Sequence, residues 1–160
     1  MCYLEESKIH DLPRMVTIQN PYSLLCRTFE GDLAEVSIRE NIGLLAYSPM
    51  GFGVLSGKYI KNTAADNARL KLFPRFGRYT NPQATKATKK YLKIAEDNNM
   101  SLAQMSLAFV TQQPFVTSNI IGATNLEQLK ENIDSINVVL NDEILAQINH
   151  VHNLIPNPAP

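Results

Sequence analysis

The chain has 160 residues, and 44% of them are hydrophobic, which is enough for one domain with its own apolar core. Its 15 basic and 15 acidic residues give a formal net charge of zero, so no global field gathers nucleic acid or an anionic membrane. No apolar run approaches the length needed to span a bilayer, and the charged residues 1–13 do not resemble a signal peptide.

The first third of the chain predicts two helices that alternate with two strands. Each strand is β-branched or aliphatic and is bounded by turn residues. In chain order, the helix, strand, helix and strand span Tyr3–His10, Arg14–Gln19, Gly31–Asn41 and Ile42–Tyr47. The dipeptide Asn20-Pro21 is a turn signal that closes the first strand. Two glycines and a proline within residues 48–53 predict a loop whose backbone closely approaches another group.

A long connection without periodicity follows over residues 62–79. It mixes basic with aromatic residues: Arg69, Lys71, Phe73, Arg75, Phe76, Arg78 and Tyr79. Such a mixture can bind single-stranded nucleic acid through base stacking and phosphate contacts. Long loops in compact domains are more often lids over an active site, so we favour a lid and expect no nucleic-acid partner.

The second half predicts helices that begin after capping residues. Asn81, Ser101 and Asn141 are the expected N-caps, and Pro82 suits the first position of its helix. A buried strand over Val116–Ile121 lies between the second and third of these caps. Alternation of strands and helices along the whole chain predicts parallel strands joined by right-handed crossovers.

The stretch from Phe115 to Ile136 is the most informative part of the sequence. After its strand, Gly122-Ala123-Thr124-Asn125 opens a helix, with Thr124 and Glu127 at the spacing of a capping box. The apolar stripe of this helix consists of Leu126, Leu129, Ile133 and Ile136, and its polar face near the N-terminus consists of Gln128, Glu131 and Asn132. A helix N-terminus can hold a phosphate, which makes this a nucleotide-site candidate. A capped surface helix with a solvated polar face explains the same residues.

Three ordered motifs carry a resemblance to a known family. They are Gln19-Asn20-Pro21-Tyr22-Ser23-Leu24-Leu25, then Tyr47-Ser48-Pro49 leading to Ser56-Gly57-Lys58-Tyr59, and then Gly122-Ala123-Thr124-Asn125 with Gln128, Glu131 and Asn132. Together they resemble the aldo-keto reductases, and most of all a bacterial branch related to the potassium-channel beta subunits. The resemblance implies an α/β fold, a (β/α)8 TIM barrel that binds NADP(H) and reduces carbonyl compounds at the carboxyl ends of its strands.

The resemblance implies that this chain is one truncated barrel domain over residues 1–160, made of the last three parallel strands with their helices. Toward the nicotinamide end of the cofactor it assigns Gln19 to the carboxamide and Tyr47 to stacking on the ring. The loop along the pyrophosphate is assigned to Ser48, Pro49, Met50, Gly51 and Phe52. Lys58 and Arg69 are implied as basic cofactor contacts.

Toward the adenosine end, the resemblance implies that Gly122, Ala123, Thr124 and Asn125 hold the 2′-phosphoribose. Gln128 matches a 2′-phosphate contact, while Glu131 and Asn132 match adenine contacts. Some branches carry Arg at the position of Gln128 and a Lys-Ser pair at Gly122-Ala123. Because this chain has fewer charges near the phosphate, we do not expect strong discrimination of NADPH over NADH.

The catalytic Asp, Tyr, Lys and His of the family belong to the first half of the barrel, which this chain lacks in the alignment. We therefore assign no catalytic residue here, and we expect His10, His150 and His152 to lie at the surface. Cys2 and Cys26 are isolated thiols without metal-ligand spacing, so we expect a cytoplasmic protein without a metal site.

These observations leave three interpretations of the function. The chain is the C-terminal fragment of an NADP(H)-dependent aldo-keto reductase, inactive alone and with weak cofactor binding at best. Alternatively, it is a stand-alone nucleotide-binding or regulatory module, or one half of a split reductase whose N-terminal half is a separate chain. Whether Met1 is a natural start is open. Because an incomplete barrel leaves apolar strand edges unpaired, we also expect a homo-oligomer that pairs those edges.

Overall fold

The computed structural model describes residues 2–160, and these form one parallel sheet of three strands with seven α-helices. The strands are β1 (Thr17–Pro21), β2 (Gly43–Tyr47) and β3 (Val116–Ile120), in the spatial order β1-β2-β3. The helices are α1 (Cys2–Ile9), α2 (Asp32–Arg39), α3 (Arg69–Leu72), α4 (Pro82–Asp97), α5 (Leu102–Thr111), α6 (Leu126–Asp134) and α7 (Asp142–Leu154). Four 3-10 segments complete the description: η1 (Thr28–Glu30), η2 (Gly51–Ser56), η3 (Gly77–Tyr79) and η4 (Ser135–Asn137).

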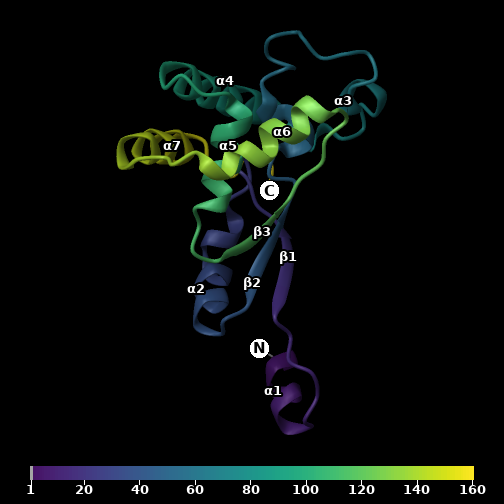
Figure 1. Ribbon diagram of the computed structural model, residues 1–160, viewed down its shortest axis with the longest axis vertical. Coiled ribbons are helices and arrows are strands. Elements are labelled where there is room, and N and C mark those ends of the chain that lie inside the picture. The colour runs from purple at the N-terminus through teal and green to yellow at the C-terminus, as the bar shows by residue number, and fades with distance from the viewer. Residues whose placement is uncertain (1) are drawn as a thin grey trace.

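The molecule is elongated, and its elements are segregated along the long axis. Figure 1 shows α1 alone at one end, the strands with α2 in the middle, and α3 to α7 gathered toward the carboxyl ends of the strands. This open, three-stranded parallel sheet with its helices is part of a (β/α)8 barrel, as the resemblance implies. No helix within residues 2–160 has both the length and the apolar character that a bilayer crossing requires.

The two faces of the sheet differ in what covers them. Leu44 and Ala46 of β2 point toward the side on which α2 contacts β2 and α5 contacts β3, and both are fully buried. The opposite face carries Gln19, Ser118 and Ile120, which are exposed. In a closed barrel this second face is the interior, so the described chain leaves half of a core uncovered.

The first strand begins and ends later than the sequence predicts. We expected Arg14–Gln19 followed by a turn at Asn20-Pro21, but Asn20 and Pro21 continue the strand opposite Ala46 and Tyr47. A proline at the last position of an edge strand costs little, since its missing N–H removes few ladder bonds. The Tyr22 N–H then donates to the Tyr47 carbonyl at 3.3 Å and extends the pairing by one residue.

The predicted helix caps are confirmed for three of the long helices. The Asn81 side chain accepts the Ala84 N–H at 2.9 Å, and the Asn141 side chain accepts the Ile144 N–H at 2.9 Å. Ser101 and Gln104 form a reciprocal capping box, in which each side chain accepts a backbone N–H of the other residue. These caps depend only on local sequence, which explains why they were predictable.

Helix α6 departs from the prediction in its cap and in its buried face. Asn125, rather than Thr124, is the N-cap, and its side chain accepts the Gln128 N–H at 2.8 Å. The polar Asn132 is buried, whereas the apolar stripe faces outward, with Leu126 82% exposed. The reason is that α6 packs on α5 and η4 beyond the edge of β3, where no described element covers its apolar side.

Candidate functional site

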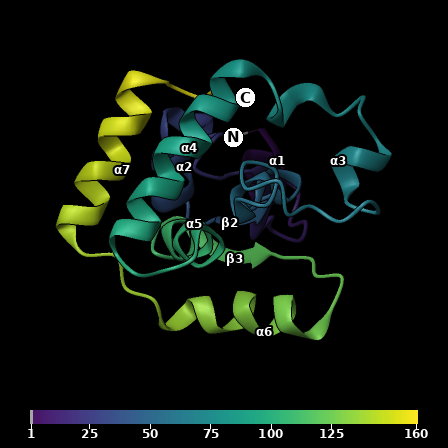
Figure 2. The same ribbon diagram turned by 90° about the horizontal axis from the view of Figure 1, so that it is seen from above.

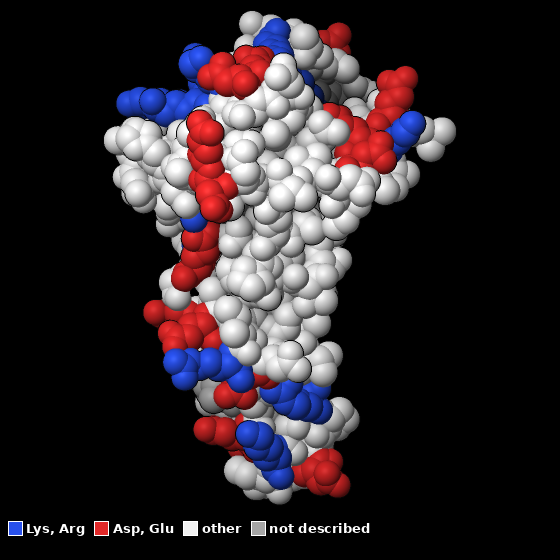
Figure 3. Space-filling view, turned by 60° about the vertical axis from the view of Figure 1, so that its left-hand side comes forward, with Lys and Arg blue, Asp and Glu red and all other residues white. Residues whose placement is uncertain are grey.

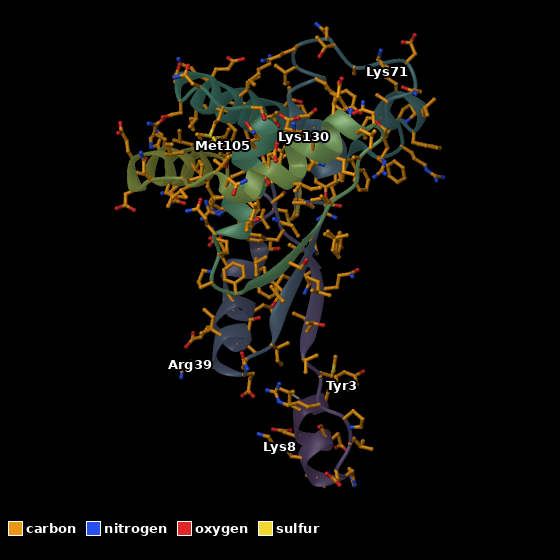
Figure 4. All side chains as sticks on the ribbon, in the orientation of Figure 1. Tyr3, Lys8, Arg39, Lys71, Met105 and Lys130 are labelled. Carbon is orange, nitrogen blue, oxygen red and sulfur yellow. The ribbon has the colours of Figure 1, made fainter. Side chains whose placement is uncertain are left out.

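The assigned cofactor residues form two groups, which begin side by side at the carboxyl ends of two neighbouring strands. Tyr47, the last residue of β2, pairs with Ile120, the last residue of β3. The loop after β2 and the turn at Gly122 therefore leave neighbouring strand ends, as ligand-binding loops do in parallel barrels. In Figure 4, the label Lys71 locates the segment that follows β2, and the label Lys130 locates α6.

The residues assigned to the nicotinamide end share the open face of the sheet. Gln19 pairs with Leu45 in the β1–β2 register, and Pro21 pairs with Tyr47. Because side chains alternate between faces along a strand, Gln19 and Tyr47 lie on one face, a diagonal step apart. Tyr47 is half-buried and Gln19 is exposed. An aromatic ring and a carboxamide thus face the same uncovered space.

The loop after β2 has an unusual backbone. Ser48 and Phe52 adopt positive φ values of 55° and 56°, which non-glycine residues rarely do. Gly51 also has a positive φ of 51°, and a Cβ there would stand 3.1 Å from the Tyr79 ring. Strained positions of this kind cluster at ligand-binding sites, where the surrounding contacts hold them in place. The buried Pro49 lies within the same loop.

Two cationic side chains lie over this loop. Arg69 of α3 places its guanidinium 5.2 Å from the centre of the Phe52 ring, within the range of a cation–π contact. The Lys58 ammonium lies 3.2 Å from where a side chain at Gly53 would begin, so glycine leaves room for it. Both positive charges therefore stand beside the backbone that the resemblance assigns to the pyrophosphate.

Residues 62–79 fold back onto this loop. They are not entirely irregular, because the single-turn helix α3 and the segment η3 interrupt them. Phe52 packs at 5.2 Å from Phe76 and at 5.0 Å from Tyr79, measured between ring centres, and Tyr79 is buried. Burial withdraws the Tyr79 ring from stacking on a base, whereas Phe73 is 46% exposed. We refer to residues 62–79 as the lid.

At the adenosine end, the turn before α6 is held by side chains of the helix itself. The Gln128 carboxamide oxygen accepts the Thr124 N–H at 3.1 Å and the Thr124 hydroxyl at 3.0 Å. The Asn132 amide donates to the Gly122 carbonyl at 3.4 Å, and the Glu131 side chain is half-buried. Asn132, which the resemblance assigns to adenine, thus braces the turn. The N–H and the hydroxyl of Thr124, which could donate to a phosphate, already donate to the Gln128 side-chain oxygen.

The two groups lie on the same side of the molecule. In both ribbon views, α3 and the N-terminal end of α6 lie on the right-hand side (Figures 1 and 2). One hollow of about 400 Å³ lies elsewhere, where Asn81 and Gln83 meet residues 154–158, and it contains none of the assigned residues. Within residues 2–160, no group of three or more His, Cys, Asp or Glu is placed to hold a metal ion.

A partly buried polar cluster in the segment after β1 was missed by the sequence analysis. Arg27 forms two hydrogen bonds to the Glu30 carboxylate, at 2.6 and 2.7 Å, and a third to Asn149 at 2.8 Å. The Tyr22 hydroxyl donates to the same carboxylate, and burial raises the pKa of Tyr22. The available signal was the i,i+3 spacing of Arg27 and Glu30, the N-cap and the last residue of the 3-10 segment η1.

His152 is half-buried, which differs from the solvated position that we expected. Its Nδ1 atom is buried and has no hydrogen-bond partner among residues 2–160. Burial lowers the pKa of the imidazole below its ordinary value of 6.5, the Arg27 guanidinium lowers it further, and Glu30 opposes the change. By contrast, His10 is exposed and lies 3.2 Å from Glu6, and His150 is exposed.

This burial predicts a pH dependence of stability. Between the lowered pKa of folded His152 and its unfolded value near 6.5, the unfolded chain binds more protons, so stability falls as pH decreases below about 6.5. Thermal melts between about pH 8 and pH 5 should show His152→Gln losing less stability than the parent on acidification. His150→Gln is the matched control and should follow the parent. An equal acid response of parent and His152→Gln would contradict the assignment.

Comparison of the sequence with known proteins identifies the family of this chain. The profile of the aldo/keto reductase family matches residues 2–153, so the chain belongs to the aldo/keto reductase family. Protein Tas of Escherichia coli strain K12 is 52% identical over 160 residues, which cover 100% of this chain and 46% of Tas. The L-glyceraldehyde 3-phosphate reductase of the same strain is 30% identical over 136 residues, which cover 81% of this chain and 39% of that protein.

A third relative bears on the branch of the family. A candidate voltage-gated potassium channel subunit beta of Schizosaccharomyces pombe is 29% identical over 154 residues, covering 92% of this chain and 45% of that protein. The predicted resemblance to aldo-keto reductases of a bacterial branch related to the potassium-channel beta subunits is therefore confirmed. The chain spans about half the length of the curated relatives that it matches.

Proposed function

We propose that this chain is the C-terminal part of an NADP(H)-dependent carbonyl reductase and carries the adenosine 2′-phosphate end of the cofactor site. The observation that carries the proposal is the turn from Gly122 to Asn125 at the start of α6, next to the open sheet face with Gln19 and Tyr47. The name of the L-glyceraldehyde 3-phosphate reductase relative supports carbonyl reduction as the reaction class.

The residues present fit a dinucleotide phosphate. The Thr124 N–H and hydroxyl both point at the one oxygen of Gln128, an arrangement that a phosphate oxygen can replace. Arg69 and Lys58 supply positive charge beside the loop after β2, where the pyrophosphate is expected. Tyr47 offers a ring face on the open side of the sheet. When bound, NADPH supplies hydride-transfer chemistry, and these side chains bind and orient it.

The proposal assigns no general acid to this chain, because protonation of a carbonyl oxygen requires a tuned donor within hydrogen-bond reach. The acid and the early contacts to the nicotinamide belong to the other half of the barrel. That half is either the remainder of a longer polypeptide or a separate chain. Without it, the open face and free edges associate with a second copy. Two free cysteines fit a cytoplasmic location.

One relative favours a second candidate function. The similarity to the candidate potassium channel subunit beta suggests a regulatory module that binds the cofactor without turning it over. This candidate needs saturable NADP⁺ binding by the isolated chain, whereas the fragment proposal expects only weak binding.

Gln128→Glu tests the proposed phosphate site. The carboxylate keeps the two bonds to Thr124 and makes them charge-assisted, so the turn should be as stable as before or more so. The same negative charge repels a phosphate, so affinity for 2′-phospho-AMP should fall by at least about tenfold. The measurement is a titration of both proteins followed by NMR chemical shifts of residues 122–132.

Gln83→Glu is the matched control, because it adds the same charge in the first turn of α4, outside the assigned site. This control should bind 2′-phospho-AMP as the parent does. Equal affinity of the parent and Gln128→Glu for 2′-phospho-AMP would contradict the proposed phosphate contact.

A further inference from the structure

The last residues of the chain are firmly held although they form no regular structure. Figure 2 shows the residues that follow α7 crossing to the start of α4. The Ala159 N–H donates to the Leu25 carbonyl at 3.0 Å, and Ala159 is fully buried. The Arg27 N–H donates to the Asn157 side chain at 2.7 Å. These bonds fix residues 156–160, which we call the tail, against the segment that follows β1.

The same tail bonds the C-terminal end of the lid. The Arg78 Nε atom donates to the Ala159 carbonyl at 3.0 Å, and the Asn81 amide donates to the Pro158 carbonyl at 2.8 Å. Asn81 also donates to the Arg78 carbonyl at 2.8 Å while it caps α4. The tail therefore holds the lid at the point where the lid joins a long, well-packed helix.

A continuous series of contacts leads from this point to the loop after β2. Arg78 stacks on the Tyr79 ring at 5.4 Å, and Tyr79 packs against the Phe52 ring at 5.0 Å. Phe52 in turn carries the Arg69 guanidinium at 5.2 Å. Tyr79 also fills the space that Gly51 leaves open. Each step is a direct contact, so a shift of Arg78 has a physical route to the loop and to Arg69.

We propose that the tail is a positioning element for the loop after β2 and for the lid. By bonding Arg78 and Asn81, it keeps Tyr79 against Phe52 and thereby fixes where Arg69 stands. This inference rests on the proposed function only where it treats the loop and lid as cofactor contacts. The contacts themselves require no ligand, so they are testable in the ligand-free chain.

The test is hydrogen–deuterium exchange on the ligand-free chain. Arg78→Gln and a chain lacking residues 158–160 should each exchange about tenfold faster than the parent over residues 51–56 and 69–79. Exchange within α5 should not change, which shows that the core remains folded. Arg75→Gln is the matched control, because Arg75 also stacks on an aromatic ring, at 5.3 Å from Phe76, and has no bond to the tail. Arg78→Lys, which retains a donor, should restore most of the protection.

Asn81→Asp is a second variant, because it keeps the cap oxygen for α4 and loses both amide donors. It should also speed exchange over residues 69–79. Unchanged exchange in Arg78→Gln and Asn81→Asp would overturn the positioning role whether or not the chain binds NADP⁺. Faster exchange in a chain that binds no NADP⁺ would support the positioning role and count against the proposed function.

Discussion

Purified alone, the chain should reduce an aromatic aldehyde with NADPH no faster than the buffer does. Mixing it with the part of Tas outside the matched segment should raise the rate by at least about 100-fold, which is the contribution expected of a placed general acid. The physical reason is that the open sheet face presents Gln19 and Tyr47 to a space that needs the opposite wall of the barrel.

The control for this experiment is the Tas part by itself, which should also be inactive. Turnover by this chain alone would contradict the assignment of the acid to the other half. Failure of the mixture to gain activity, with both parts folded and bound to each other, would contradict the proposed reductase function.

The isolated chain should be a dimer or larger assembly at high concentration. Val16 is 65% exposed beside β1, and Ile120 is 41% exposed at the end of β3, so each sheet edge exposes a large apolar side chain and has no further strand paired to it within residues 2–160. Figure 3 shows an uncharged area over the centre of this face, bordered on the left by a column of acidic side chains, with further charged side chains toward the two ends. Unpaired apolar edges template association, and a lysine on an edge blocks it.

Light scattering measures this prediction directly. Val16→Lys and Ile120→Lys should each shift the population toward the monomer, and the double variant should be monomeric. Leu154→Lys places the same charge at an exposed apolar position of α7, away from both edges, and should leave the assembly unchanged. A parent chain that is strictly monomeric at high concentration would contradict the prediction.

The sequence predicts those features of this chain that depend on local interactions. Asn81, Ser101 and Asn141 cap their helices as expected, because a cap requires only a side chain and an N–H three residues later. The three strands and their parallel order follow from apolar runs that alternate with helices. Which face of α6 is buried depends on its packing against α5, and the apolar stripe of α6 did not predict that face.

The site shows the same division. The resemblance assigns the loop after Tyr47 and the turn at Gly122 to one cofactor site, and the β2–β3 register brings the ends of these two strands together. The shift of the cap from Thr124 to Asn125 was not predictable, because both residues suit an N-cap and the choice depends on the bond from Gln128. The path from the tail through Arg78 joins segments about eighty residues apart, and no local pattern reveals it.

The central claim is that the adenosine end of an NADP(H) site is present here and the nicotinamide end is incomplete. The helix-end field and one or two hydrogen bonds contribute about 1–3 kcal/mol, and a millimolar dissociation constant requires about 4 kcal/mol. The direct measurement is an NMR titration of residues 122–132 with NADP⁺ and, separately, with 2′-phospho-AMP. Similar binding of both, at millimolar affinity or weaker, is the predicted result. Micromolar NADP⁺ binding that 2′-phospho-AMP cannot reproduce would show an intact nicotinamide end and contradict the account.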